Sequence, residues 1–363
     1  MSTRAGASRR IAYVDYARGF SMLAIILFHY FMIMNLPGPL NSLIQFGGSG
    51  VHLFFLLSGF GLTLSRRKLG VLQFYARRLA RVLLPYYLAI AVIACASFLV
   101  FAAPFDWYAL SGHFFLFKMF DSEIMNSYGG QMWFMSALIQ LYLVYPLLAK
   151  IQDILDDDLE FFVLGLSASL FWNAVLVGMD LMEQRAWNSF FLQFIWEFML
   201  GMILARRLRQ EKAPYWEGPL WLILSIWLIG TAIMAALVFG VPYGKAVNDY
   251  FALLSFGGLS VLAFRMHLFR ALLSYTGKIS LELYLVHLAI LHILLHYFDG
   301  MLSLPVIVLF ALTLSYAVSI PFAKFNTRVF QWIAPLLERF FAKKPQGPDA
   351  SAAGSSHEHL EGT

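Results

Sequence analysis

The chain has 363 residues, of which 60% are hydrophobic and 13% are charged, and its mean hydropathy is +0.70. These values exclude an ordinary soluble globular protein and predict an all-α, polytopic transmembrane helical bundle. Loop topology explains the formal net charge of +5 better than nucleic-acid binding does, so no nucleic-acid partner is predicted. The single cysteine, Cys95, cannot form an intrachain disulfide.

Apolar segments recur along the chain and predict about ten membrane spans. We expect no second folded domain: residues 1–344 form one transmembrane domain, and the polar residues 345–363 form a disordered cytoplasmic tail. The predicted spans cover residues 12–34, 48–65, 82–103, 131–149, 161–179, 189–205, 218–240, 249–264, 279–298 and 303–323.

The lysine and arginine residues predict the orientation of these spans. With the N-terminus in the cytoplasm, 23 of the 26 basic residues fall on the cytoplasmic side, and only Lys118, Arg185 and Lys245 fall outside. Basic loops remain in the cytoplasm, so both termini are predicted to be cytoplasmic. The stretch 151–160 places five acidic residues on the same side, but acidic residues contribute little to this bias.

The first segment carries two ionisable side chains, Arg18 and His29, eleven residues apart. A helix would separate them by about 16 Å along its axis, which places His29 past the middle of the bilayer. An ionisable group at that depth indicates a functional site. The alternatives are that Arg18 is an anchor that snorkels to the headgroups and that His29 is a satisfied polar residue between helices.

The second segment contains another histidine, His52, followed by the small residues Ser58, Gly59 and Gly61. The predicted topology places His52 in the outer part of the membrane, close to the expected depth of His29. We therefore predict that the first two spans pack antiparallel, with His29 and His52 as near neighbours. The small residues favour close helix packing.

Arg78 and Arg81 lie three residues apart in a strongly basic stretch, so a helix would place them on one face. Arginine suits bidentate contacts with phosphate, which predicts a phosphate site at the cytoplasmic face. The alternative is ordinary contact with lipid headgroups.

Two intramembrane carboxylates, Glu197 and Glu282, are predicted to face the bundle interior, and Glu282 to pair with Lys278. His292 and His296 have a spacing that a metal site could use. No thiolate or carboxylate ligands accompany them, so no metal is predicted.

Five motifs occur in a fixed order over residues 11–330, and together they resemble the membrane acyltransferase-3 family. The first is Arg18 with His29, and the third is the pair Arg78 and Arg81 followed by Pro85. The other three are the stretches 50–60 (GVHLFFLLSGF), 132–146 (MWFMSALIQLYLVYP) and 276–287 (TGKISLELYLVH). In many members an Asp occupies the position of His52.

The resemblance implies a bacterial inner-membrane enzyme with ten helices. Such an enzyme moves an acyl group, usually acetyl, from cytoplasmic acyl-CoA to a hydroxyl of an envelope glycan, glycolipid or related acceptor. Acyl-CoA is then a co-substrate, and no permanently bound cofactor is expected. The essential histidine of the family falls on His29 and its basic partner on Arg18. Arg78 and Arg81 fall on the pair thought to contact the CoA phosphates.

The mechanism that we expect uses His29 as a general base or as the carrier of an acyl group. His52 and Ser58 are candidate donors to the oxyanion. Ser58, Trp133, Gln140 and His287 are candidate acceptor-binding residues; Trp133 also fits an interfacial belt, and His287 could instead bond a neighbouring helix. The alternative function is a transporter of a glycolipid or small acid whose histidines relay protons. The acceptor, the acyl chain length and the oligomeric state stay open.

Overall fold

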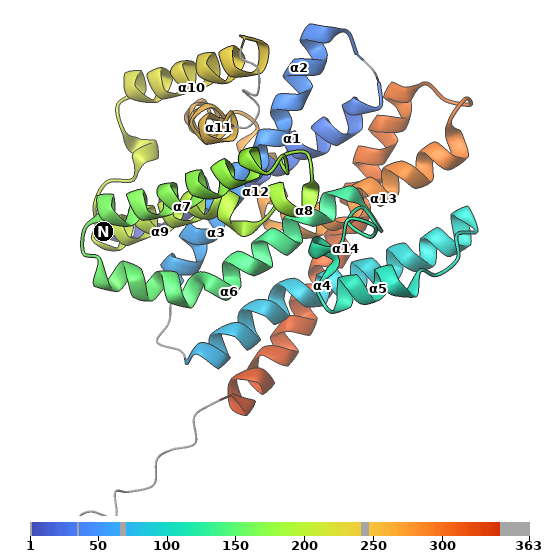
Figure 1. Cartoon of the computed structure of the whole chain (residues 1–363), viewed down its shortest axis with the longest axis horizontal. Helices are drawn as coiled ribbons and strands as arrows, with labels where there is room; N and C mark the ends of the chain where they lie inside the picture. Colours follow the sequence, from blue (N-terminus) through green and yellow to red (C-terminus); the bar gives the residue numbers. More distant parts are fainter. Residues whose placement is uncertain (1, 35, 66–69, 241–246, 342–363) are drawn as a thin grey trace, which may run out of the picture.

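The computed structural model describes residues 2–34, 36–65, 70–240 and 247–341, and these residues form helices joined by short connections, with no strand among them (Figure 1). The helices are α1 (Ser2–Met32), α2 (Gly38–Phe46), η1 (Gly47–Ser49), α3 (Gly50–Leu64), α4 (Val71–Phe101), α5 (Trp107–Phe114), η2 (Lys118–Phe120), η3 (Gly130–Met132), α6 (Trp133–Ile154), α7 (Asp158–Gly178), α8 (Arg185–Asn188), η4 (Phe191–Phe194), α9 (Ile195–Arg209), η5 (Tyr215–Glu217), α10 (Leu220–Gly240), α11 (Asp249–Arg265), α12 (Arg270–Lys278), α13 (Ser280–Phe298) and α14 (Leu304–Phe340).

Eight helical segments in the described residues are long and apolar enough to cross a membrane, which confirms the all-α polytopic bundle. They match the second to seventh, ninth and tenth predicted spans. The first predicted span lies in α1, whose apolar run is interrupted by Asp15, Arg18 and His29. The eighth lies in α11, which has only 17 residues. The total of ten spans therefore stays a prediction.

Several helices extend beyond the predicted spans. The predicted loop 35–46 is largely helical, and one helical segment runs from Leu43 to Leu64. The helix α4 begins at Val71 instead of residue 82, and α14 continues to Phe340. Hydropathy detects only the apolar part of a helix, whereas arginine and lysine are good helix formers and allow a helix to continue into water. The predicted tail, residues 345–363, lies outside the described residues.

Glycines bring several pairs of helices into backbone contact. A Cβ atom at Gly59 of α3 would collide with the carbonyl of Phe198 in α9, and one at Gly201 of α9 would collide with the carbonyl of Leu56. In the same way, a Cβ atom at Gly19 of α1 would meet the backbone of α12. Small residues permit such close approach between membrane helices, so the close packing predicted around Gly59 is confirmed.

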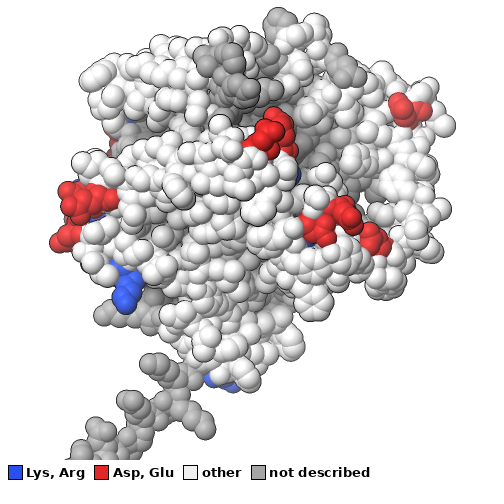
Figure 2. Space-filling model, viewed as in Figure 1, with Lys and Arg blue, Asp and Glu red and all other residues white. Residues whose placement is uncertain are grey.

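The surface of the bundle suits a lipid environment. Figure 2 shows wide areas of one face without charged side chains, and the charged residues that are visible lie in small groups. The helix α10 lies at an edge of the bundle in Figure 1, and only 11% of its apolar window is buried. Such a helix presents apolar side chains to lipid on most of its circumference.

We name the two ends of the bundle. The basic end is the one where α1 and α4 begin and where α9 and α14 end. The distal end is the opposite one. Asp158, from the acidic stretch 151–160, accepts hydrogen bonds from Nε of Arg206 at 2.9 Å and Nε of Arg207 at 2.8 Å. The acidic stretch therefore lies beside the basic residues of α9, as its assignment to the same side requires.

The connection between α4 and α6 forms part of the distal end and holds a buried lysine. The Lys118 side chain is 1% exposed, and its only described partner is the Ser127 carbonyl, 3.4 Å from Nζ. Burial without a carboxylate lowers the pKa of Lys118 from 10.5 to about 7. The folded protein therefore holds this amine in its neutral form more readily than the unfolded chain does.

We expect Lys118→Met to change how stability depends on pH. Below pH 7 the lysine is charged in both states, and its burial cost is present in full. As pH rises from 7 towards 10.5 only the unfolded state stays protonated, so the free energy of unfolding of the wild type rises by up to about 1.4 kcal/mol per pH unit. The free energy of unfolding of the variant lacks this increase. Apparent melting temperatures at pH 7 and pH 9.5 check the difference; parallel pH curves for the two proteins would contradict it.

Candidate functional site

The centre of the site is a pair of histidines from α1 and α13. The Nδ1 atom of His29 lies 3.0 Å from Nε2 of His287, and the ring centroids are 5.1 Å apart. His287 is fully buried, whereas His29 is partly exposed. Of the two alternatives for His287, the bond to a neighbouring helix is the one that the structure shows.

The neighbouring Tyr30 fixes the position of this pair. Its hydroxyl lies 3.0 Å from the carbonyl oxygen of His287 and 2.7 Å from Oγ of Ser315 in α14. Tyr30 and Ser315 are both fully buried. One side chain of α1 thus ties α13 and α14 together directly beside His29.

The backbone of α13 determines which ring nitrogens carry hydrogen. Nδ1 of His287 lies 2.9 Å from the carbonyl oxygen of Tyr284 and 3.1 Å from that of Leu283. Carbonyl oxygens only accept, so Nδ1 of His287 is the donor and Nε2 of the neutral ring is an acceptor. His29 must then donate from its own Nδ1. Its Nε2 is left with a free lone pair, as a general base requires.

His52 belongs to a different polar group. Its Nδ1 lies 2.6 Å from Oε1 of Glu197, and its Nε2 lies 3.8 Å from Oδ1 of Asp249. Glu197 is fully buried, as predicted, whereas the Asp249 side chain is 42% exposed. In the described part of the chain, no hydrogen bond or ring contact joins this group to His29.

The packing of α1 against η1 and α3 places His29 and His52 at different depths. A Cβ atom at Gly47 would meet Ala24 and Phe28, and one at Gly50 would meet Ser21 and Ile25. The helices are therefore antiparallel, as predicted. This register puts His52 about eight residues, or roughly 12 Å, nearer the basic end than His29.

The predicted similar depth is therefore wrong, and the cause is the hairpin. Helix α2 occupies most of the expected loop, so the chain reverses between the end of α1 at Met32 and the start of α2 at Gly38. A residue on α2, close to the reversal, shares the depth of His29. His52 lies well beyond that point along the chain.

Three arginines gather at the basic end. Arg78 interacts electrostatically with Arg18 and Arg81, and Arg81 also interacts with Arg18. Nη2 of Arg78 donates to Oγ of Ser65, and the guanidinium of Arg81 lies over the ring of Phe330, 4.5 Å from its centroid. Among the described residues, none of the three arginines forms an ion pair with a carboxylate. Uncompensated guanidinium groups at one place form an anion site.

The neighbouring Arg77 differs from these three, because it forms an ion pair with Glu338 of α14. A surface pocket of about 350 Å³ lies between α4 and α14. It is lined by Arg77, Arg81, Phe330, Gln331, Ala334, Pro335 and Glu338. Arg81 therefore borders an open space at the basic end.

The other predicted residues have different surroundings. Oγ of Ser58 donates to the Phe54 carbonyl of its own helix at 2.8 Å. The Gln140 amide contacts Sδ of Met119 at 3.3 Å and accepts from the backbone N–H of Phe191 at 3.3 Å. These contacts join α6 to its neighbours, and the structure does not bring Ser58 or Gln140 into contact with His29.

Trp133 contacts Arg185, a residue that lies outside the five sequence motifs. The guanidinium of Arg185, at the start of α8, lies over the Trp133 ring with Cζ 5.1 Å from the centroid. Arg185 also interacts electrostatically with His29. The only sequence signal for this residue was its place among the three basic residues outside the cytoplasmic set.

Glu282 is buried, as predicted, but its partner is not Lys278. Its Oε1 accepts from Nδ2 of Asn326 in α14 at 3.0 Å. The tertiary contact with α14 replaces the expected pair within one helical turn. No group of three candidate metal ligands occurs in the described residues.

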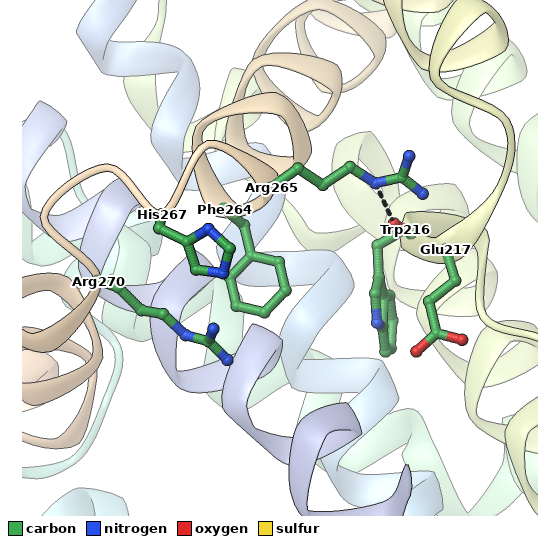
Figure 3. A pocket seen from close by; sticks show the side chains of 6 residues that line it. All are labelled: Trp216, Glu217, Phe264, Arg265, His267 and Arg270. Atoms are coloured by element: carbon green, nitrogen blue, oxygen red, sulfur yellow. Dashed lines mark hydrogen bonds between the residues drawn. The ribbon is translucent and has the colours of Figure 1, made fainter.

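A larger pocket, of about 460 Å³, lies at the basic end between the α9–α10 and α11–α12 connections (Figure 3). Arg265 extends across it and donates to the carbonyl oxygens of Trp216 at 2.9 Å and Gly218 at 2.5 Å. None of the predicted site residues lines this pocket. Its lining residues are Trp216, Glu217, Phe264, Arg265, His267 and Arg270. The bonds of Arg265 hold the two connections together.

Comparison with protein families matches residues 11–324 to the acyltransferase-3 family, described as an acyltransferase domain. The searches of curated proteins and of solved structures returned no match. The matched range includes the histidine pair, the three arginines and Arg185. Because the match extends over most of the chain, this membrane protein belongs to the acyltransferase-3 family.

Proposed function

We propose that the protein transfers an acyl group, acetyl in the simplest case, from cytoplasmic acyl-CoA to a hydroxyl of a cell-envelope glycan, glycolipid or related acceptor. The observation that carries this proposal is the bond between His29 and His287, which leaves Nε2 of His29 with a free lone pair. Membership of the family supplies the reaction class. The acyl donor and the acceptor are part of the proposal.

In the proposed reaction, Nε2 of His29 removes the proton from the acceptor hydroxyl as its oxygen bonds to the thioester carbonyl carbon. The tetrahedral intermediate then collapses and its carbon–sulfur bond breaks. The thiolate of CoA takes the proton from the His29 imidazolium. The products are an ester and free CoA, and the histidine returns to its neutral form.

The arginines at the basic end support a binding place for the donor. Arg18, Arg78 and Arg81 form a cationic group without a described carboxylate partner, and CoA carries several phosphate charges. The continuous helix α1 puts Arg18 about 16 Å from His29 along its axis. An extended pantetheine arm can cover that distance, so phosphates at the arginines and a thioester at His29 are compatible.

The proposed location is a bacterial inner membrane with both termini in the cytoplasm. The assignment of 23 of the 26 basic residues to the cytoplasmic side supports this orientation. This orientation places the basic end where acyl-CoA is available. The acceptor would reach His29 from the distal end. Transport of a glycolipid or small acid is the weaker candidate, because family membership does not favour it.

The test is acyl transfer by the purified protein in lipid nanodiscs. Acetyl-CoA labelled in its acetyl group is supplied with an envelope glycolipid extract, and labelled ester and free CoA thiol are measured. We expect both products in equal amounts. A folded protein that releases no thiol and labels no acceptor would contradict acyl transfer.

A further inference from the structure

Arg185 places an exposed guanidinium at the distal end. Among the described residues, this side chain makes no hydrogen bond and no ion pair, and its close contact is the face of Trp133. Arginine has five N–H donors in a planar fork that matches an acid group. A cation–π contact with an indole restrains the guanidinium and leaves its N–H donors available for an acid group.

Ring contacts connect this guanidinium to the histidine pair. Trp133 touches Phe134 with 6.2 Å between centroids, and Phe134 touches Tyr284 at 5.3 Å. Tyr284 in turn contacts His287 at 6.1 Å, and Arg185 interacts electrostatically with both Tyr284 and His29. Arg185 is therefore linked to the histidine pair by these rings and by its charge, on the side away from the arginines at the basic end.

The distal end has few other positive charges. Of the three basic residues assigned to it, Lys118 is buried and Lys245 lies outside the described residues. Asp249 attracts Arg185 electrostatically but forms no ion pair with it, and this carboxylate also faces His52. The charge of Arg185 is thus only partly balanced by the protein.

We propose that Arg185, held on Trp133, binds an acid group of the acceptor, so that the substrate is an anionic sugar with the acylated hydroxyl near its carboxylate or phosphate. This inference rests on the acyl transfer proposed above. A charged group at this place orients the acceptor, because one charge-assisted contact fixes the distance of the hydroxyl from His29. Trp133 acts as a positioning residue for Arg185.

The experiment compares two synthetic glycosides that differ in one acid group, octyl glucuronide and octyl glucoside, kept below their micelle concentrations. Isothermal titration with the protein in nanodiscs gives the affinities without turnover. We expect the wild type to bind the glucuronide at least tenfold more tightly than the glucoside. Arg185→Gln should remove this difference, and Arg185→Lys should keep part of it.

Two further arms complete the test. Octyl glucoside 6-phosphate tests whether Arg185 selects phosphate or carboxylate. The acid glycoside that binds with the higher affinity, the phosphate or the glucuronide, identifies the group that Arg185 selects. Arg207→Gln, which removes a cation from the basic end, is the matched control and should keep the wild-type preference. Unchanged acetyl-CoA affinity in Arg185→Gln shows that the variant is folded.

Equal or undetectable binding of the acid and neutral glycosides by the wild type would overturn the proposal, as would a preference that survives in Arg185→Gln. Failure of acyl transfer is recognised separately. A protein that prefers the acid glycoside but releases no CoA thiol contradicts only the reaction. A protein that turns over without any preference contradicts only the role of Arg185.

Discussion

Replacing His29 by alanine is expected to lower the turnover number for acyl transfer by about 10²–10⁴-fold, the usual contribution of a positioned general base. The partner His287 should act differently, because it only orients the base. His287→Leu removes the acceptor of the His29 Nδ1 hydrogen and should reduce turnover and shift its pH profile. His287→Gln offers a carbonyl oxygen to that hydrogen and should restore part of the activity.

The matched control for both histidines is His296→Leu. This residue lies on the same helix α13, and its described ring contacts are with Phe101 and Tyr297. Release of CoA thiol, followed at several pH values, measures all four variants. Wild-type turnover in a folded His29→Ala protein would exclude His29 as the base. An unshifted pH profile in His287→Leu would reduce His287 to a packing residue.

Arg78→Gln and Arg81→Gln are each expected to raise the KM for acetyl-CoA by about 10- to 150-fold, with a smaller effect on kcat. This range follows from about 1.5–3 kcal/mol for a charge-assisted phosphate contact. The salt dependence of KM should also fall, because fewer phosphate charges remain paired in the variants. Initial rates over a range of sodium chloride concentrations measure both effects.

Arg77→Gln is the control for this second prediction. Arg77 neighbours Arg78 in the sequence, but its charge is already paired with Glu338. We expect its KM to stay within a few-fold of the wild-type value. An equal rise in KM for all three variants would show that these arginines form a general basic surface that contacts lipid headgroups.

Sequence patterns predicted the membrane class and most helices, because apolar runs long enough to cross a bilayer rarely occur outside membrane-spanning helices. They also predicted that Glu197 faces the bundle interior, because a carboxylate within a membrane helix needs a polar partner, which lipid does not offer. The partner itself, His52, could not be predicted, because the two residues are 145 positions apart. The same holds for His29 and His287, which are separated by 258 positions.

The depth of His52 in the membrane could not be predicted from its position in the sequence alone. The expected depth depended on where the chain reverses, and α2 moved that point towards α1. Arg185 was missed because it lies outside the motifs, and its importance depends on the ring of Trp133 beneath it. Both errors concern tertiary contacts that local hydrophobicity does not encode.

The backbone contacts at Gly59, Gly201 and Gly19 have a consequence for how the protein can move. A slide of one residue along α3 and α9, or along α1 and α12, would bring a side chain to a place where only hydrogen fits. Such pairs move as single bodies. His52 and Glu197 lie on one of these pairs, and His29 lies on the other. Any opening that admits an acceptor must therefore come from helices outside these pairs. The lipid-facing α10 moves together with α11, because a Cβ atom at Gly230 would meet the backbone of Ser255.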